Sequence, residues 1–245
     1  MIKLLIPFYL KITILFGQQR GTPSPTVDLT DSIATRLTAN EKLIEKQKAV
    51  KILGVWLQED GGWQRNVDET CKAAYARVSM LTKLKYAGVN RNDLLHIYKM
   101  FIRSRLEYCV VPMHYSLTSH QAAALERVQS VSLRIILNDE YTSYQEALNL
   151  TSLETLSSRR QDRCLKFSLK CLGHPSNYRI FPENQNQINP LKTRNREPFK
   201  VNFAHTERYR KSAIPSCQRL LNQHMGEVEE RRRRETGEEE EMRRR

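Results

Sequence analysis

The sequence predicts a mainly α-helical protein with a small antiparallel β hairpin near its N-terminus, an α+β fold. Apolar residues recur at helical spacing from about position 61 to 172. Short runs rich in β-branched and aromatic residues occur only before position 58. With 245 residues, of which 40% are hydrophobic, the chain is long enough to bury a sizeable core.

Two short runs predict strands. Residues 9–16 (YLKITILF) and 50–57 (VKILGVWL) are rich in β-branched and aromatic side chains, and we expect these two strands to pair with each other. Residues 17–27 contain two Gly and two Pro and are expected to form a loop. Residues 40–48 (NEKLIEKQK) are expected to be a polar connection.

Two long amphipathic helices are expected next. The apolar face of the first has spacings of four and three residues and consists of Val67, Cys71, Ala74, Val78 and Leu81. The second begins after Asn90, and its apolar positions are Leu94, Leu95, Tyr98, Phe101, Ile102 and Leu106. Each segment is therefore expected to be an amphipathic helix.

Capping signals predict three further helices. Thr118 with Gln121, and Ser143 with Glu146, match the capping box and open helices at 119–137 and 144–150. Another helix is expected from position 153 or 155 to 172, because residues 173–175 (GHP) end it. Beyond position 175 we expect irregular structure and one short helix around 216–223. Residues 227–245 consist almost wholly of Glu and Arg, which is typical of a solvated helix or of disorder.

The charge of the chain points to a polyanionic partner. The net charge is +13 and the pI is about 9.7. Basic residues concentrate in segments 72–105, 159–170 and 192–211, and four tyrosines near them could stack on bases: Tyr86, Tyr98, Tyr178 and Tyr209. A scattered basic surface that merely solvates the protein is the alternative interpretation.

A membrane or secreted protein is not expected. The longest apolar stretch, residues 1–16, is interrupted by Lys3, Pro7 and Lys11 and is short for a membrane span. It is not followed by a cleavage site typical of a signal peptide. The five cysteines are irregularly spaced, which indicates a reducing compartment and hence an intracellular location, cytoplasmic or nuclear.

Common enzymatic motifs are absent from the sequence. It contains no Asp–Asp pair, no phosphate-binding glycine loop and no zinc-protease or serine-hydrolase motif. The spacing of the cysteines and histidines is poor for zinc, so we interpret Cys164 and Cys171 as core thiols and expect no metal. No cofactor is expected.

A series of short motifs occurs in a characteristic order. They are KILGV at 51–55, Trp63, IYKMFIRSRLEY at 97–108, LERVQ at 125–129, LRIIL at 133–137, Tyr144 with Ala147 and Leu148, LSSRR at 156–160, Phe181 with Pro182, TERYRKSAIP at 206–215 and LLN at 220–222. In this order they resemble the region that follows the catalytic palm in reverse transcriptases of non-LTR (LINE-type, jockey-like) retrotransposons. The resemblance covers about residues 11–222.

The resemblance implies four segments and a set of binding residues. Residues 1–57 would be a remnant of the palm edge, 58–175 a helical thumb-like region, 176–226 a basic arm and 227–245 a low-complexity tail. Lys51 and Gly54 lie in the motif that resembles the primer-gripping strand and turn, where Gly lets a backbone approach closely. The implied contacts to nucleic-acid phosphates are Arg77, Lys83, Lys85, Arg103 and Arg105. Arg159 and Arg160 match the family's Arg–Arg pair, for which phosphate binding and helix packing or salt bridging both remain open.

The sequence also departs from the family. The family's paired catalytic aspartates lie upstream of this region and do not occur in this chain, so we expect no catalytic residue and no nucleotidyl transfer by this chain alone. Mg²⁺ is expected only for the intact family enzyme. The chain is therefore interpreted as a fragment of an RNA-directed DNA polymerase that binds RNA or DNA nonspecifically at most. The alternatives are a helical protein-interaction module, whose partners the sequence does not identify, or a non-functional transposon remnant.

Overall fold

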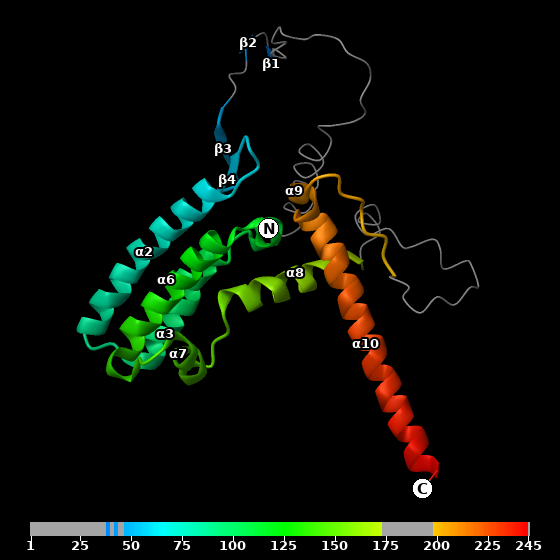
Figure 1. The fold of residues 1–245 in the computed structure, drawn as a ribbon. Coiled ribbons are helices and arrows are strands. Elements are labelled where there is room, and N and C mark those ends of the chain that lie inside the picture. Colours follow the sequence, from blue (N-terminus) through cyan, green and yellow to red (C-terminus); the bar gives the residue numbers. More distant parts are fainter. Residues whose placement is uncertain (1–37, 40–41, 44–46, 173–197, 245) are drawn as a thin grey trace. The chain divides into compact units, whose positions relative to one another are not determined.

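The computed structural model describes residues 38–39, 42–43, 47–172 and 198–244 (Figure 1). The chain forms two compact units, Met1–Asn66 and Val67–Arg245, which are described separately. The described residues are mainly helical and include an antiparallel two-stranded hairpin, so the predicted α+β class is confirmed. The strand expected at residues 9–16 lies outside the described residues.

The hairpin of the first unit consists of β3 (Ala49–Ile52) and β4 (Val55–Gln58), paired from Ala49 with Gln58 to Ile52 with Val55. The prediction of one strand over residues 50–57 is wrong. The chain reverses at Leu53 and Gly54, whose φ angles are 48° and 84°. A two-residue loop with positive φ at both positions follows the right-handed twist of the strands. The sequence did not indicate this turn, because the apolar Leu53 occupies a position where Asn or Asp is usual.

A second strand pair also belongs to this unit. β1 (Thr38–Ala39) and β2 (Lys42–Leu43) are antiparallel, in a stretch where the sequence predicted no strand. The β3–β4 hairpin is tied to the following residues by two hydrogen bonds. The Trp56 amide donates to Asn66 Oδ1 at 3.1 Å, and the Arg65 amide donates to Gln58 Oε1 at 2.9 Å. The Arg65 guanidinium also lies 3.7 Å from the centre of the Trp56 ring, as in a cation–π contact.

The first long helix is α2 (Gln64–Tyr86), and its predicted apolar face is buried. Val67, Ala74, Val78 and Leu81 are each at most 5% exposed, whereas Cys71 is half-buried. The next helix, α3 (Arg91–Ile97), begins as expected at Asn90, whose side-chain oxygen accepts the Asp93 amide. α3 continues directly into a π-helical turn, η1 (Tyr98–Arg103), and then into α4 (Ser104–Leu106).

The π-helical turn changes which side chains face the core. Its wider spacing frees backbone carbonyls from the regular helical pattern. The Met100 carbonyl accepts the Ser104 hydroxyl, and the Phe101 carbonyl accepts Arg77 Nη1 at 2.6 Å. Phe101, which regular helical spacing placed on the buried face, is 50% exposed. That prediction is wrong because the spacing assumed an uninterrupted α-helix.

Short elements α5 (Val110–Met113) and η2 (His114–Ser116) lead into α6 (Ser119–Leu137), whose bounds agree with the prediction. Thr118 and Gln121 make both hydrogen bonds of the capping box. After η3 (Asn138–Glu140), α7 (Tyr144–Thr151) begins at Ser143 with one bond of the expected box, from the Glu146 amide to the Ser143 hydroxyl. α8 (Leu156–Leu172) then begins one residue after the later of the two predicted starts.

The last helices are α9 (Glu207–Arg210) and α10 (Ala213–Arg244). The sequence predicted a short helix around 216–223 and a solvated helix or disorder over 227–245, whereas α10 is one helix of 32 residues that continues through the Glu/Arg-rich segment. Its first turns pack against α8, with Cys217 and Leu221 at most 1% exposed. Salt bridges between residues four positions apart stabilise the later turns of α10, as between Glu230 and Arg234 at 2.5 Å.

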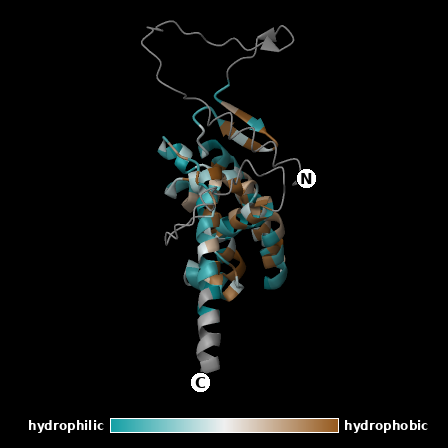
Figure 2. Ribbon diagram, turned by 90° about the vertical axis from the view of Figure 1, so that its right-hand side faces the viewer, coloured by the Kyte–Doolittle hydropathy of each residue, from teal (hydrophilic) through white to brown (hydrophobic). Residues whose placement is uncertain are grey.

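The core of the second unit lies between its helices, where Figure 2 shows apolar residues gathered. α6 contacts α3, α7 and α8, and Leu125, Leu133 and Ile136 on it are at most 1% exposed. Within the described part of the chain, no helix is long and apolar enough to cross a membrane.

Candidate functional site

Glu107 of the second unit follows α4, and its side chain is only 3% exposed. Arg159 bonds both of its carboxylate oxygens, through Nε and, at 3.3 Å, through Nη2. Arg163 Nη2 donates to Oε2 at 2.6 Å, and Arg103 Nε lies 3.9 Å from Oε1. We call Arg103, Glu107, Arg159 and Arg163 the arginine cluster.

Local backbone geometry brings these residues together. Arg103 precedes Glu107 by four residues, and Arg159 precedes Arg163 by four, so each pair occupies neighbouring positions on a helical surface. The chain leaves α4 at Glu107 and turns at Cys109, which has a left-handed φ of 61°. Glu107 thereby meets α8, although 52 residues separate it from Arg159.

The arginine cluster carries more positive than negative charge. Three guanidinium groups surround one carboxylate, so the cluster has a net charge of +2. The hydrogen bond to Glu107 raises the pKa of Arg159, whereas burial and the neighbouring Arg159 charge lower the pKa of Arg103. Both remain charged at neutral pH because the ordinary pKa of arginine lies far above 7.

The exposure of the cluster increases from one arginine to the next. The side chains of Arg103, Arg159 and Arg163 are 17%, 25% and 48% exposed. A carboxylate has two oxygens, and each guanidinium has five N–H donors, so one carboxylate leaves N–H donors of Arg163 available to solvent. Such a group suits an anion, and the planar fork of arginine matches phosphate oxygens.

Two of the predicted phosphate contacts brace α2 against neighbouring elements. Arg77 bonds the Phe101 carbonyl, and Lys85 Nζ lies 3.4 Å from the Ile136 carbonyl. Lys83, two residues earlier, is exposed. Arg105 is half-buried, and its Nε atom has no hydrogen-bond partner among the described residues. The structure therefore places these four residues outside the arginine cluster.

The predicted Arg–Arg pair divides between two environments. Arg159 joins the arginine cluster, whereas Arg160 is 1% exposed. Its Nε and Nη1 atoms have no hydrogen-bond partner within the described parts of the chain. Burial lowers its pKa, while the charges of Glu126 and Glu107 act in the opposite direction. Arg159 thus forms a salt bridge and Arg160 packs in the interior, while phosphate binding by Arg159 stays a prediction.

Lys51 and Gly54 belong to the first unit. Lys51 is exposed on β3, and its Nζ atom lies 5.7 Å from the centre of the Trp56 ring. Gly54 occupies the second position of the hairpin turn, where its positive φ of 84° favours glycine. The turn residue predicted for close backbone approach is thus also required by the hairpin itself.

The tyrosines considered for stacking have different environments. Tyr98 is 0% exposed and donates its hydroxyl to Gln129 at 2.5 Å, so the prediction that it stacks on bases is wrong. Tyr86 is 88% exposed, and Tyr209 is half-buried. Tyr178 lies outside the described residues. The sequence reasoning missed Arg163, for which the four-residue spacing from Arg159 was the available signal.

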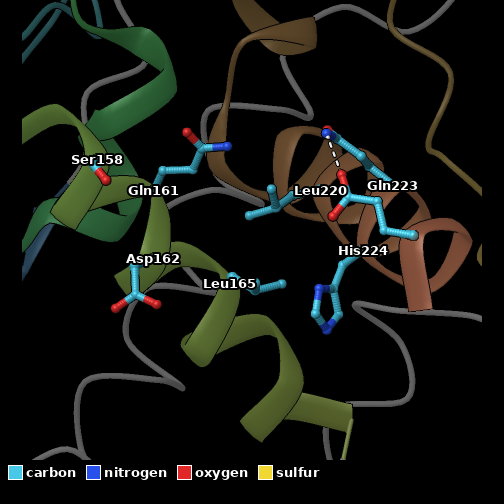
Figure 3. A pocket seen from close by; sticks show the side chains of 8 residues that line it. Ser158, Gln161, Asp162, Leu165, Leu220, Gln223 and His224 are labelled. Atoms are coloured by element: carbon cyan, nitrogen blue, oxygen red, sulfur yellow. Dashed lines mark hydrogen bonds between the residues drawn. The ribbon is translucent and has the colours of Figure 1, made fainter. Parts of the chain in front are cut away.

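A second candidate is a groove of about 250 Å³ between α8 and α10 (Figure 3). Its lining consists of Ser158, Gln161, Asp162, Leu165, Leu220, Gln223, His224 and Glu227. Asp162 pairs with Lys166 at 2.7 Å, and Gln223 donates to Glu227 at 3.0 Å, the contact drawn in Figure 3. The groove contains two carboxylates and no Lys or Arg, so it is unsuited to a polyanion.

The cysteines of α8 are buried, as predicted. Cys164 lies against Cys217 of α10, and a hydrogen bond with that thiol, together with burial, raises its pKa. Among the described residues, no three His, Cys, Asp or Glu side chains form a group that could hold a metal ion. Cys164 and Cys217 therefore contribute to the packing of α8 against α10.

Comparisons with models of protein families, with curated proteins and with solved structures found no match. The resemblance to reverse transcriptases stays a prediction.

Proposed function

We propose that this chain is the post-palm part of a non-LTR retrotransposon reverse transcriptase and that it binds RNA or DNA through the phosphate backbone. The observation that supports binding most directly is the +2 charge of the arginine cluster, three of whose members are guanidinium groups. The order of the sequence motifs supports the family. Contacts of this kind position nucleic acid without reading its sequence.

Glu107 makes the arginine cluster a better phosphate site than scattered surface arginines would be. It holds Arg159 through two hydrogen bonds and Arg163 through one at 2.6 Å. These side chains therefore lose less rotamer freedom when a phosphate binds. The half-exposed Arg163 is the member that contacts the phosphate first.

The proposal assigns no catalytic residue to this chain. Two-metal nucleotidyl transfer needs clustered carboxylates, and the sequence has no Asp–Asp pair. A primer-extension assay with Mg²⁺ is expected to show no product from the purified chain. Extension by that sample would contradict this part of the proposal.

Binding to a labelled RNA–DNA duplex, measured by fluorescence anisotropy across a series of salt concentrations, tests the proposal. We expect the logarithm of the affinity to fall linearly with the logarithm of salt concentration, because each phosphate contact releases counterion. Arg163→Ala is expected to weaken binding by about tenfold and to reduce the salt slope by about one.

Arg91→Ala is the matched control. Arg91 also pairs with one glutamate, Glu140, at 2.7 Å, and its side chain is 35% exposed. Arg91 Nη2 also donates to the Leu150 carbonyl at 3.2 Å. The pair has no surplus charge, so its loss should leave binding nearly unchanged. Equal effects of the two substitutions, or binding that does not change with salt, would contradict the proposal.

A further inference from the structure

The outer face of α2 contains a short repeat. Residues 72–75 (KAAY) and 83–86 (KLKY) both have a lysine followed three positions later by a tyrosine, and the second copy begins 11 residues after the first. α2 is a regular α-helix over both copies, and 11 residues are about three of its turns. The second pair therefore lies in line with the first, about 16 Å farther along the axis. We call Lys72, Tyr75, Lys83 and Tyr86 the Lys–Tyr repeat.

The Lys–Tyr repeat lies on the side of α2 that the core does not use. Both lysines are exposed, and Tyr75 and Tyr86 are 38% and 88% exposed. The buried face of the helix consists of other positions, among them Val78 and Leu81. Within the described part of the chain, the four side chains of the repeat form no hydrogen bond and no ion pair. The fold of this unit therefore does not account for them.

The surface between the two pairs is low. Ala76 and Ser79 are exposed there and lie on the same helical face as the pairs. The Ser79 hydroxyl donates to the Ala76 carbonyl at 2.8 Å, so it is bonded to its own helix. A ligand that runs along this face meets no large side chain between one Lys–Tyr pair and the next.

The surroundings of the Lys–Tyr repeat are cationic. Residues 70–92 include five Lys or Arg and no acidic residue. Burial raises the pKa of Tyr75, whereas the charge of the exposed Arg127 on α6 acts in the opposite direction, so a cation of a second helix also acts on this ring. Flat rings among cations are complementary to a partner that combines flat apolar groups with regularly spaced anions. Single-stranded nucleic acid has this chemistry.

We propose that a single strand of RNA or DNA binds along the outer face of α2, with the tyrosines of the Lys–Tyr repeat stacking on its bases and the lysines contacting its phosphates. This inference rests on the proposed function for the class of partner, and it adds a second site that prefers unpaired bases. Bases inside a duplex are stacked on each other and present no free face to a tyrosine. At about 3.4 Å per nucleotide, the two pairs are about five nucleotides apart.

The experiment uses the full chain and two single-stranded probes of equal length and charge, an oligothymidylate of about ten nucleotides and an abasic deoxyribose-phosphate oligomer. Fluorescence anisotropy measures both affinities. Tyr86→Ala is expected to reduce affinity for the oligothymidylate about tenfold and to leave affinity for the abasic oligomer unchanged. Tyr86→Phe should retain binding because the ring stacks. Lys83→Ala should weaken binding of both probes and reduce the salt slope by about 0.7.

Phe203→Ala is the matched control, because Phe203 is an aromatic residue that is 78% exposed and lies outside α2. Its substitution should change neither affinity. A loss with Phe203→Ala as large as that with Tyr86→Ala would overturn the inference, as would an equal loss on both probes with Tyr86→Ala. Equal affinity of the unmodified chain for both probes would overturn the stacking and leave the proposed function intact. Failure of the unmodified chain to bind either probe would overturn both proposals.

Discussion

Two glutamates of the helical unit, Glu126 and Glu107, are held in opposite ways. Glu126 accepts the backbone amides of Leu156 and Ser157, at 3.2 and 2.7 Å, and the Tyr144 hydroxyl at 2.6 Å. All three donors are neutral. Glu107, in contrast, is held by arginine side chains. The Glu126 carboxylate thus caps the first turn of α8. The Glu107 carboxylate pairs with arginines farther along the same helix.

Hydrogen bonds connect Glu126 to a network of uncharged side chains. Gln129, which is 0% exposed, donates to the Tyr144 hydroxyl and to the Glu154 carbonyl, both at 2.9 Å, and accepts the Tyr98 hydroxyl at 2.5 Å. Burial raises the pKa of Tyr98, so its hydroxyl stays protonated and donates. Each polar group in this chain of contacts has a partner, which is the condition for a stabilising buried network.

The difference shows that membership of a motif does not determine whether a charged residue has neutral or charged partners. Glu126 and Gln129 belong to one motif of the resemblance, and Glu107 and Arg159 belong to two others. The carboxylate of the first motif is surrounded by uncharged donors, whereas Glu107 and the arginines of the other two motifs form a cluster that reaches a net charge of +2 only with Arg163, which lies in no motif.

The largest expected effect comes from Glu107→Gln. Removal of this buried carboxylate leaves three arginines without their counter-charge, which should lower the free energy of unfolding by about 3 kcal/mol. Urea unfolding followed by circular dichroism measures the change. A loss below about 1 kcal/mol would show that Glu107 behaves as an ordinary surface partner and would remove the contrast with isolated surface pairs.

Gln129→Leu is expected to lower the free energy of unfolding by about 2 kcal/mol, because the buried Tyr98 hydroxyl loses its acceptor. The double variant with Tyr98→Phe should be more stable than Gln129→Leu alone, since no hydroxyl is then left unpaired. Urea midpoints of the two single variants and the double variant give the coupling. Strictly additive losses would contradict the network.

The pH dependence of stability tests the environment of His114 near the buried Arg160. Burial, and then the Arg160 charge, lower the pKa of His114 from 6.5 to about 4. The unfolded chain therefore binds the proton first, and stability should be complete above about pH 6.5 and decline as the pH falls toward about 4. His114→Gln should reduce this decline in thermal-melting curves. An unchanged pH profile would mean that His114 does not lie near a positive interior.

The smallest effect is expected for Glu140→Gln. The Arg91–Glu140 pair has side chains that are 35% and 60% exposed, and exposed pairs contribute roughly 0–1 kcal/mol. Urea unfolding should give a change below about 0.5 kcal/mol, which provides the reference for Glu107→Gln. A loss as large as that of Glu107→Gln would mean that burial does not distinguish the two carboxylates.

Most helix bounds and caps could be predicted because they depend on local chemistry. The apolar spacing from Val67 to Leu81 and the capping box of Thr118 specify α2 and α6 without reference to distant residues. The length of α10 was underestimated because its later turns are stabilised by Glu–Arg spacing rather than by an apolar face. The π-helical turn was not predicted either, because no residue type is characteristic of such a turn.

The sequence by itself determined the basic character, the helical class and the order of motifs of this protein. Only the tertiary structure decided which charges are accessible: Arg160 is interior, Arg163 is half-exposed, and Glu107 pairs with Arg163, which is 56 residues away in the sequence. The physical reason is the range of the interactions. Helix periodicity and capping act within a few residues, whereas the balance of a buried charge is set by the packing of elements far apart in the chain.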